Sequence, residues 1–382
     1  MLYRSIRRAF ALASVAALCA GGLAACGGGG GSNTSTSGGT SGGASSGKSG
    51  TVALLLPENK TARYESADRP LFTRALSRYC PNCKLIYSNA QQDAAKQQSQ
   101  AEAAITNGAR VLVLDPVDAK AAAAIVTRAK QSGIGVVSYD RLVQNANVDY
   151  YISFDNRTVG ELQARTLVAK LRGDGARGSL VMINGAPTDP NAAQFKAGAH
   201  SVLDSSGYRI AKEYDTPDWS PDRAQTEMDQ AISALGKTGF VGVYAANDGT
   251  AGGAIASMKS NGIDPAARPT TGQDAELAGI QRIVIGDQYM TVYKAYKPEA
   301  TQAAQLAVAL LNGQTSSNLT NRQVNNGQKS VSSVILTPVA VTQRNIDATV
   351  VRDGLYTVRQ ICTSAYASGC RRIGLTTAQG QG

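Results

Sequence analysis

Residues 241–261 read VGVYAANDGTAGGAIASMKSN, a short apolar run followed by two polar residues and a stretch with helical spacing. The apolar run predicts a strand, and its lack of alternation with polar residues is typical of a parallel strand buried on both faces. The polar pair Asn247-Asp248 stands where this strand ends. The unit of strand, polar loop and helix predicts an α/β fold with polar residues gathered at one edge of a sheet.

The same unit recurs along most of the chain. Strands are predicted at 52–56, 84–87, 111–114, 135–138, 180–183, 209–214, 241–244 and 291–293. Helices are predicted at 65–79, 91–107, 120–131, 158–171, 191–205, 221–235 and 250–261. Repeated units of this kind form doubly wound parallel sheets with right-handed crossovers. Because about 330 residues follow residue 50, twice a common domain size, we expect two such lobes with a ligand cleft between them.

The first 26 residues predict export. Three arginines precede an apolar run at 10–20 that is too short to span a bilayer, which is the pattern of a removable signal peptide. The small residues before Cys26 resemble the lipidation motif of bacterial lipoproteins. We therefore expect residues 1–25 to be removed and Cys26 to carry a lipid, which would anchor the protein to a membrane in the periplasm or at the cell surface. The alternative is an ordinary signal peptide that is cleaved near Ala25.

Residues 26–50 are expected to form a tether. Beyond the cysteine they consist almost entirely of Gly, Ser, Thr and Asn, a composition that cannot bury a core and behaves as a flexible coil. Within the tether, residues 42–49 read GGASSGKS and match the phosphate-binding loop pattern. That loop needs a strand before it and a helix after it. Here a low-complexity tract precedes and a strand follows, so we interpret the match as composition.

The cysteines support export. Cys19 would leave with the signal peptide, and the four that remain besides Cys26 form two pairs that are close in sequence: Cys80 with Cys83, and Cys362 with Cys370. In an oxidising compartment we expect two disulfides. A redox-active dithiol at 80–83 is the alternative, but this pair ends a predicted helix rather than opening one, where a thiol pKa would be lowered. A zinc site of four thiols has no histidine to support it, and no metal or other cofactor is expected.

Composition excludes several classes of function. The formal net charge is +10, but the basic residues are scattered and the chain is predicted to be exported, so nucleic-acid binding is not expected. The single histidine, His200, falls on a predicted helix and is expected to face solvent, which excludes catalytic triads. The sequence motifs of serine hydrolases and of zinc proteases do not occur. An enzyme is not expected; the alternative would pair Asp140 with Asp274 as in a glycosidase.

Polar residues follow several predicted strands. Asp140-Arg141 follow the strand at 135–138, Asp274 follows residues 270–273, and Lys294 follows the strand at 291–293. The carboxyl ends of parallel strands meet at the ligand cleft, so we expect these side chains to converge there. Sugar hydroxyls both donate and accept hydrogen bonds, and this mixture of carboxylates, amides and cations matches them. The only tryptophan, Trp219, is a candidate plate for the apolar face of a sugar ring.

Six blocks of sequence, taken in order, carry a resemblance to a known family. They are SYDR at 138–141, DYYISFDN at 149–156, VGELQA at 159–164, NDGTAGGA at 247–254, GQDAELAGI at 272–280 and MTVYK at 290–294. Over residues 52 to about 353 the chain resembles the ribose/galactose-type family of type I periplasmic binding proteins, and above all its xylose-binding members. The resemblance implies a monomer that captures a monosaccharide and delivers it to the permease of an ABC transporter. A membrane-tethered sugar sensor is the alternative.

The resemblance also implies the division of the chain. It assigns 51–154 plus 296–336 to an N-terminal lobe and 155–295 plus 337–382 to a C-terminal lobe, joined by three hinge crossovers. The tail from residue 354 onward and the cysteine pairs lie outside the family's pattern, and we interpret them as an extension and local staples.

Nine substrate-binding residues are implied by position: Arg63, Tyr64, Asp140, Arg141, Asn191, Trp219, Asn247, Asp274 and Lys294. Tyr64 replaces a tryptophan of the xylose-binding members, and the loop before it departs from the family as well. These departures make a pyranose sugar a firmer expectation than D-xylose itself, which remains our choice. With Asn247 as a sugar contact, Asp248 is left as the residue that caps the following helix.

Overall fold

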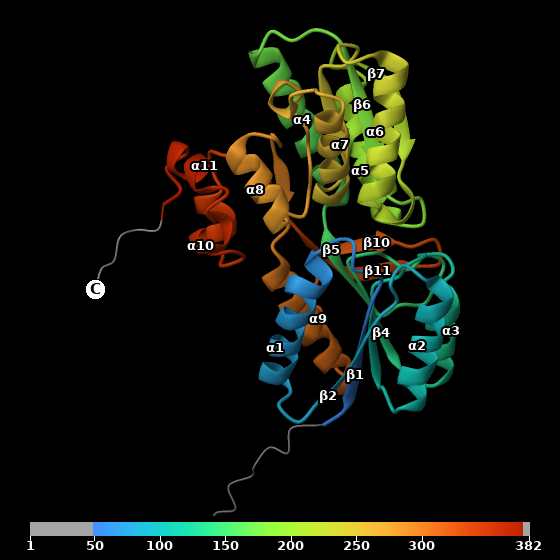
Figure 1. Ribbon diagram of the computed structural model, residues 1–382. Coiled ribbons are helices and arrows are strands. Elements are labelled where there is room, and N and C mark those ends of the chain that lie inside the picture. The colour runs from blue at the N-terminus through green and yellow to red at the C-terminus, as the bar shows by residue number, and fades with distance from the viewer. Residues whose placement is uncertain (1–48, 377–382) are drawn as a thin grey trace, which may run out of the picture. The chain divides into compact units, whose positions relative to one another are not determined.

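The computed structural model describes residues 49–376 of the chain (Figure 1). The predicted signal peptide, the lipidation site Cys26 and the tether up to residue 48 lie outside the described residues, and so do residues 377–382. The stretch that matches a phosphate-binding loop is also outside them, apart from its last residue. Within 49–376, no helix is both long enough and apolar enough to cross a membrane.

A seven-stranded sheet forms the centre of what we call the first lobe. Its strands are β1 (Thr51–Leu56), β2 (Lys84–Asn89), β3 (Val111–Leu114), β4 (Gly135–Tyr139), β5 (Tyr150–Phe154), β10 (Arg322–Asn325) and β11 (Ser330–Leu336). They follow the order β10-β11-β5-β4-β3-β1-β2, and all neighbours are parallel except the β10–β11 pair. Every residue of β3 is buried, which explains why its sequence VLVL shows no alternation.

Helices cover both faces of this sheet (Figure 1). The η1 turn (Tyr64–Asp68), α1 (Arg69–Tyr79) and α9 (Tyr296–Leu311) lie on one face, and α2 (Ala94–Thr106) and α3 (Ala123–Gln131) lie on the other. Phe72 and Leu306 share a core on the first face, and Ile125 belongs to a separate core on the second. Helix α2 begins three residues later than predicted because the side chain of Asp93 accepts a hydrogen bond from the Lys96 N–H and fixes the helix start.

The second lobe contains a three-stranded parallel sheet in the order β7-β6-β8. Its strands are β6 (Ser179–Asn184), β7 (Arg209–Asp215) and β8 (Gly242–Ala245), and an antiparallel pair, β9 (Thr291–Tyr293) and β12 (Val339–Val341), belongs to the same lobe. Its helices are α4 (Asn156–Gly173), α5 (Pro190–Leu203), α6 (Pro221–Leu235), α7 (Asp248–Ser260) and α8 (Leu277–Ile285), with short 3₁₀ turns η2 (Pro217–Trp219) and η3 (Pro265–Ala267). Helices α4 and α5 pack against each other, as do α6 and α7. The two pairs cover separate cores around Met182 and Val243.

The chain passes between the lobes three times. It does so from β5 to α4, from β9 to α9 and from β11 to β12. A hydrogen bond from the Asp155 N–H to the Leu336 carbonyl (3.0 Å) ties the first passage to the third. The predicted fold class, two doubly wound α/β lobes with three crossovers, is confirmed.

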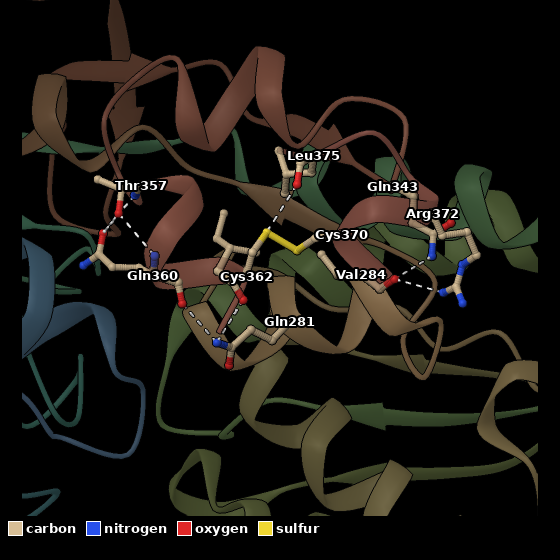
Figure 2. The surroundings of a disulfide bond; sticks show 10 residues. Gln281, Val284, Gln343, Thr357, Gln360, Cys362, Cys370, Arg372 and Leu375 are labelled. Carbon is tan, nitrogen blue, oxygen red and sulfur yellow. Dashed lines mark hydrogen bonds between the residues drawn. A yellow bond between two sulfur atoms is a disulfide. The ribbon is translucent and has the colours of Figure 1, made fainter. Parts of the chain in front are cut away.

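Residues 342–376 form an extension that packs against α8. It contains η4 (Asp347–Val351), α10 (Val358–Ile361) and α11 (Ala367–Arg372). Gln343 and Arg372 both donate to the Val284 carbonyl in the last turn of α8 (3.3 and 3.1 Å; Figure 2). Gln343 also donates to the Ile283 carbonyl (2.7 Å). The extension is therefore an integral part of the second lobe.

Both predicted cysteine pairs lie at disulfide distance. The sulfur atoms of Cys80 and Cys83 are 1.98 Å apart immediately after α1, and those of Cys362 and Cys370 are 2.04 Å apart in the extension (Figure 2). Cys370 is buried in the core that the extension shares with α8, together with Ile280 and Ile361. The Cys362–Cys370 disulfide thus closes a loop, and both ends of this loop belong to the core.

Replacing both Cys362 and Cys370 by serine is expected to lower the free energy of unfolding by about 2.5 kcal/mol, because a cross-link over eight residues restricts the unfolded chain. The matched change of Cys80 and Cys83, whose separation is three, should cost only about 1.5 kcal/mol. Urea unfolding followed by circular dichroism measures both values. A larger loss for the shorter loop would contradict the loop-length argument.

Candidate functional site

The carboxyl ends of strands from both lobes border one hollow, which we call the interlobe cavity. Asp140 and Arg141 directly follow β4, Lys294 directly follows β9, and Asn247 precedes α7. The wall consists of Thr61, Tyr64, Asp140, Arg141, Asp189, Asn191, Phe195, Trp219, Asn247, Gln273, Asp274 and Lys294. The space between these side chains, part of which is open to solvent, amounts to about 240 Å³.

The structure brings eight of the nine predicted substrate-binding residues into this wall: Tyr64, Asp140, Arg141, Asn191, Trp219, Asn247, Asp274 and Lys294. Arg63 is not part of the wall. Four wall residues were not predicted, namely Thr61, Asp189, Phe195 and Gln273. Gln273 adjoins the predicted Asp274, and Asp189 stands two residues before the predicted Asn191, so both could have been found by including the neighbours of predicted positions. Phe195 lies inside α5, where an apolar residue reads as ordinary core.

Arg63 contacts the wall residue Asp140 but does not line the cavity itself. Its guanidinium donates to both carboxylate oxygens of Asp68 (2.8 Å each) and to Glu299 (2.7 Å). Its remaining nitrogen lies 3.4 Å from the carboxylate of Asp140. Arg63 is 2% exposed, so these charges interact with little screening by water. The arginine therefore orients Asp140 instead of lining the cavity.

Asp140 is held as a charged acceptor at the cavity wall. Its carboxylate accepts a hydrogen bond from the Tyr64 hydroxyl (2.8 Å). Burial by itself would raise the pKa of Asp140, but Arg63, Lys294 and Arg141 outweigh burial and lower this pKa to about 2. The residue also has a φ of 54°, in the left-handed region that few residues other than glycine and asparagine occupy. Backbone strain of this kind is concentrated at functional sites.

Contacts between wall residues join the lobes. The Arg141 Nε lies 3.0 Å from the Asp189 carboxylate, and the Asn191 side-chain amide donates to the backbone oxygen of Asp140 (3.1 Å). Arg141 and Asp140 belong to the first lobe, whereas Asp189 and Asn191 flank the start of α5 in the second. The structure therefore represents a closed arrangement of the cleft.

Two acceptors in the wall have no donor among the described residues. They are the side-chain oxygens of Asn191 and Gln273, and both are buried. Buried polar atoms in folded proteins are nearly always hydrogen-bonded. Both oxygens are therefore suited to accept hydrogen bonds from ligand hydroxyl groups.

Asp274 and Lys294 form the polar part of the wall in the second lobe. The Lys294 ammonium lies 2.8 Å from the Asp274 carboxylate. Burial lowers the pKa of Lys294, but Asp274 and Asp140 more than compensate, so the pKa is raised and the ammonium stays charged. Asp274 has a φ of 87° and Ala275 a φ of 47°. The Tyr296 hydroxyl, at the start of α9, donates to the Asp274 carbonyl and helps to hold this strained turn.

Trp219 and Phe195 supply the apolar part of the wall. Their ring centroids are 6.3 Å apart in an edge-to-face arrangement. The Trp219 indole N–H donates to Asp189 (3.1 Å), and Trp219 has a φ of 53°. Positive φ is a genuine outlier for so bulky a residue. The indole is therefore fixed by a hydrogen bond and by a strained turn.

The prediction that Asp248 caps α7 is wrong. Asn247 occupies the capping position: its side-chain oxygen accepts from the Thr250 N–H (2.8 Å), and Thr250 reciprocates to the Asn247 N–H. The Asp248 carboxylate accepts instead from the Glu276 N–H (2.8 Å) and the Gln288 amide (2.6 Å). Asp248 thus fastens the turn that carries Asp274 to α7, and Asn247 both caps the helix and lines the cavity.

The arrangement fits binding better than acid catalysis. A glycosidase acid needs a raised pKa, whereas the pKa of Asp140 is lowered to about 2. His200 is not part of the wall; it lies on α5, partly buried, with its ring nitrogens near Asp204 (2.9 Å) and Glu213 (3.2 Å). Within 49–376, no group of three or more His, Cys, Asp or Glu side chains is placed to hold a metal ion.

Residues 52–315 match the family model described as the periplasmic binding protein domain. The chain belongs to this family. Its closed two-lobed architecture and interlobe cavity are thereby those of a periplasmic binding protein of type I.

Named relatives of this periplasmic binding protein bind sugars. It is 37% identical to the D-xylose-binding periplasmic protein of Escherichia coli over 313 residues, which covers 81% of this chain and 92% of that protein. It is 36% identical to the D-xylose-binding periplasmic protein of Haemophilus influenzae over 314 residues, with 81% and 91% covered. A solved ABC transporter solute-binding protein of Clostridium phytofermentans with bound β-D-glucose superposes with a TM-score of 0.74 at 27% identity, covering 81% of this chain and 99% of that one. These are binding proteins, and this chain is not an enzyme.

Proposed function

We propose that the protein captures a monosaccharide in the interlobe cavity, D-xylose in the first place, and presents it to the permease of an ABC transporter. The observation that carries this proposal is the composition of the wall. Charged acceptors, charged donors and two unpartnered amide oxygens surround a small hollow that also has aromatic surfaces. The relatives that are named for D-xylose, and the solved relative with bound β-D-glucose, support a sugar of pyranose size.

The wall offers each part of a sugar a complementary partner. Asp140 and Asp274 accept hydrogen bonds from hydroxyl groups, and Arg141 and Lys294 donate to hydroxyl oxygens. The C–H face of the ring packs against Trp219. Because each charge in the wall already has an opposite charge nearby, a neutral sugar adds hydrogen bonds without leaving a buried charge unpaired.

Capture is coupled to closure of the cleft. Contacts such as Arg141 to Asp189 exist only when the two lobes meet, and a sugar that touches both lobes favours this state over the open one. The three chain passages between the lobes are the natural hinges. The permease would then recognise the closed form, in which the lobe surfaces beside the cleft take up a fixed relative position.

We further propose that the mature protein begins at a lipidated Cys26 and works as a tethered monomer. The tether at 26–50 would leave the two lobes, 51–154 plus 296–336 and 155–295 plus 337–382, free to reach the permease. Mass spectrometry of the mature N-terminus tests the anchor, with Cys26→Ser as the matched variant. Unmodified Cys26 in the membrane-extracted protein would contradict lipidation.

A calorimetric screen tests sugar capture and its specificity. D-Xylose, D-glucose, D-ribose, L-arabinose and D-galactose are titrated separately into the purified protein. We expect D-xylose to bind with a Kd of about 1 μM or below, corresponding to about −8 kcal/mol, and D-glucose to be the strongest competitor. Absence of heat and of any thermal shift with all five sugars would overturn the proposal.

A further inference from the structure

A loop of the first lobe, residues 57–62, contributes to the wall of the interlobe cavity. Thr61 from this loop is part of the wall. The Glu58 carboxylate accepts hydrogen bonds from the N–H groups of Lys60 and Thr61 (2.5 and 2.9 Å), so the loop has a fixed shape. Its next N–H group, that of Ala62, does not bond within the loop. It donates across the cleft to the Glu276 carboxyl group of the second lobe, at 3.0 Å.

Glu276 differs from the wall residues that also bond across the cleft. Arg141, Asp189 and Asn191 line the cavity, so their contacts change directly when a sugar enters. Glu276 is outside the wall and is 8% exposed. It stands immediately before α8, and its backbone N–H is bonded to Asp248. The backbone of Glu276 is thus fixed within the second lobe, and only its side chain reaches the first.

We propose that Glu276 is a positioning residue that latches the closed cleft. Its carboxyl group accepts a hydrogen bond from the Ala62 N–H of the 57–62 loop and stabilises closure without touching the sugar. The inference rests on the proposed function, because closure matters only if the cavity holds a ligand. It goes beyond that function by naming a residue outside the binding wall that sets the affinity. Opening the lobes breaks this bond and returns the carboxyl group to water.

The surroundings of Glu276 give the latch a measurable signature. The ionisable groups that face it are Asp248 of α7, Asp274 of its own turn, Arg282 of α8 and Tyr356 of the extension. Burial, with the charges of Asp248 and Asp274, raises the pKa of Glu276 to about 8 against the opposing effects of the Ala62 N–H and Arg282. Burial first, and then the charges of Glu276 and Asp248, raise the pKa of Tyr356, so its phenol stays neutral.

The affinity for sugar should therefore depend on pH. In the open form the exposed carboxyl group has an ordinary pKa of about 4.3. Closure raises this pKa, so closing takes up a proton at any pH between the two values. The contribution to closure is complete below pH ~4.3 and is lost as pH rises toward about 8. The bonds of Asp248 lie within the second lobe, so its proton affinity changes little on closure.

The test compares Glu276→Gln, Glu276→Ala and wild type. Glutamine keeps the oxygen that accepts from Ala62 but cannot titrate, and alanine removes the acceptor. Glu161→Gln is the matched control, because Glu161 lies on α4 of the same lobe and, among the described residues, pairs with arginines on its own helix. D-Xylose is titrated by calorimetry from pH 5.5 to 8.5, and the fluorescence of Trp219, the only tryptophan, reports closure. Repeating the titrations in phosphate and in Tris, which differ in ionisation enthalpy, counts the protons taken up.

For wild type and the Glu161→Gln control, we expect the Kd to rise by about tenfold or more from pH 5.5 to 8.5. Glu276→Gln should show less than about a twofold change and take up no proton, and Glu276→Ala should bind about tenfold to a hundredfold more weakly at pH 5.5. Wild-type affinity and wild-type pH dependence in both Glu276 variants would overturn the latch and leave sugar capture standing. Failure of the wild type to bind D-xylose or any of the other four sugars would overturn the proposed function and the latch with it.

Discussion

Replacing Asp274 by alanine is expected to weaken D-xylose binding by about two to three orders of magnitude, because removing one partner of a buried charge pair costs about 2–5 kcal/mol. The variant loses the proposed acceptor for a sugar hydroxyl and leaves the Lys294 ammonium, 2.8 Å away in the wild type, without its nearest counter-charge. Lys294 is 3% exposed, so water cannot replace the missing carboxylate.

The backbone at Asp274 allows its roles to be separated. With a φ of 87°, alanine is strained at this position, whereas asparagine tolerates positive φ and glycine adopts it freely. Asp274→Asn therefore removes only the charge, and Asp274→Gly removes the side chain without strain. Asp274→Ala removes the side chain and leaves a strained backbone. We expect the Kd to increase in that order and the melting temperature of the sugar-free protein to be lowest for Asp274→Ala. Calorimetry and thermal melting measure these two orders, and a Kd for Asp274→Ala within threefold of wild type would contradict the assignment.

The parts of the fold that could be predicted from the sequence are those with a strong local pattern. The strand at 111–114, the strand at 291–293 and the helix at 221–235 were predicted with the bounds that the structure has. Helix α9 and the β10–β11 hairpin were not predicted as elements. The helix is buried at many positions around its circumference, so its amphipathic period is weak, and the hairpin lies at the edge of the sheet with mostly polar residues in β10.

The candidate site was predictable where function follows from position at a strand end, as at Asp140 and Lys294. It could not be predicted where the role of a residue depends on the side chains and backbone that it contacts in the folded protein. Arg63 lies near the wall, but Glu299, which is 236 residues away in sequence, turns its guanidinium toward the supporting network. The choice between Asn247 and Asp248 as helix cap depends on backbone angles that two adjacent polar residues do not reveal. Phe195 joins the wall only because α5 presents it beside Trp219.

Trp219 is tightly held in the wall. The residue is 2% exposed, its indole N–H is bonded to Asp189, and its backbone turn is strained. The ring also lies directly against Gly185, the residue that follows β6. A Cβ atom added at Gly185 would lie 2.0 Å from Cη2 and 2.2 Å from Cζ2 of the indole, far inside van der Waals contact. The observed position of the Trp219 indole therefore requires a glycine at residue 185.

Replacing Gly185 by alanine is accordingly expected to weaken D-xylose binding by about a hundredfold, as much as Trp219→Ala, although residue 185 itself is not part of the cavity wall. The extra methyl group displaces the indole, which breaks its bond to Asp189 and shifts the surface on which we propose that the sugar stacks. Overpacking of this kind costs about 1–3 kcal/mol. Gly173→Ala is the matched control, since an added Cβ there meets nothing within 4 Å.

In the double variant Gly185→Ala/Trp219→Ala the indole ring that would clash is absent. The Kd of the double variant should therefore equal that of Trp219→Ala alone. Such a non-additive result identifies the indole as the group through which Gly185 acts. Additive losses in calorimetric titrations of the four proteins would show instead that Gly185 affects the sugar by another route.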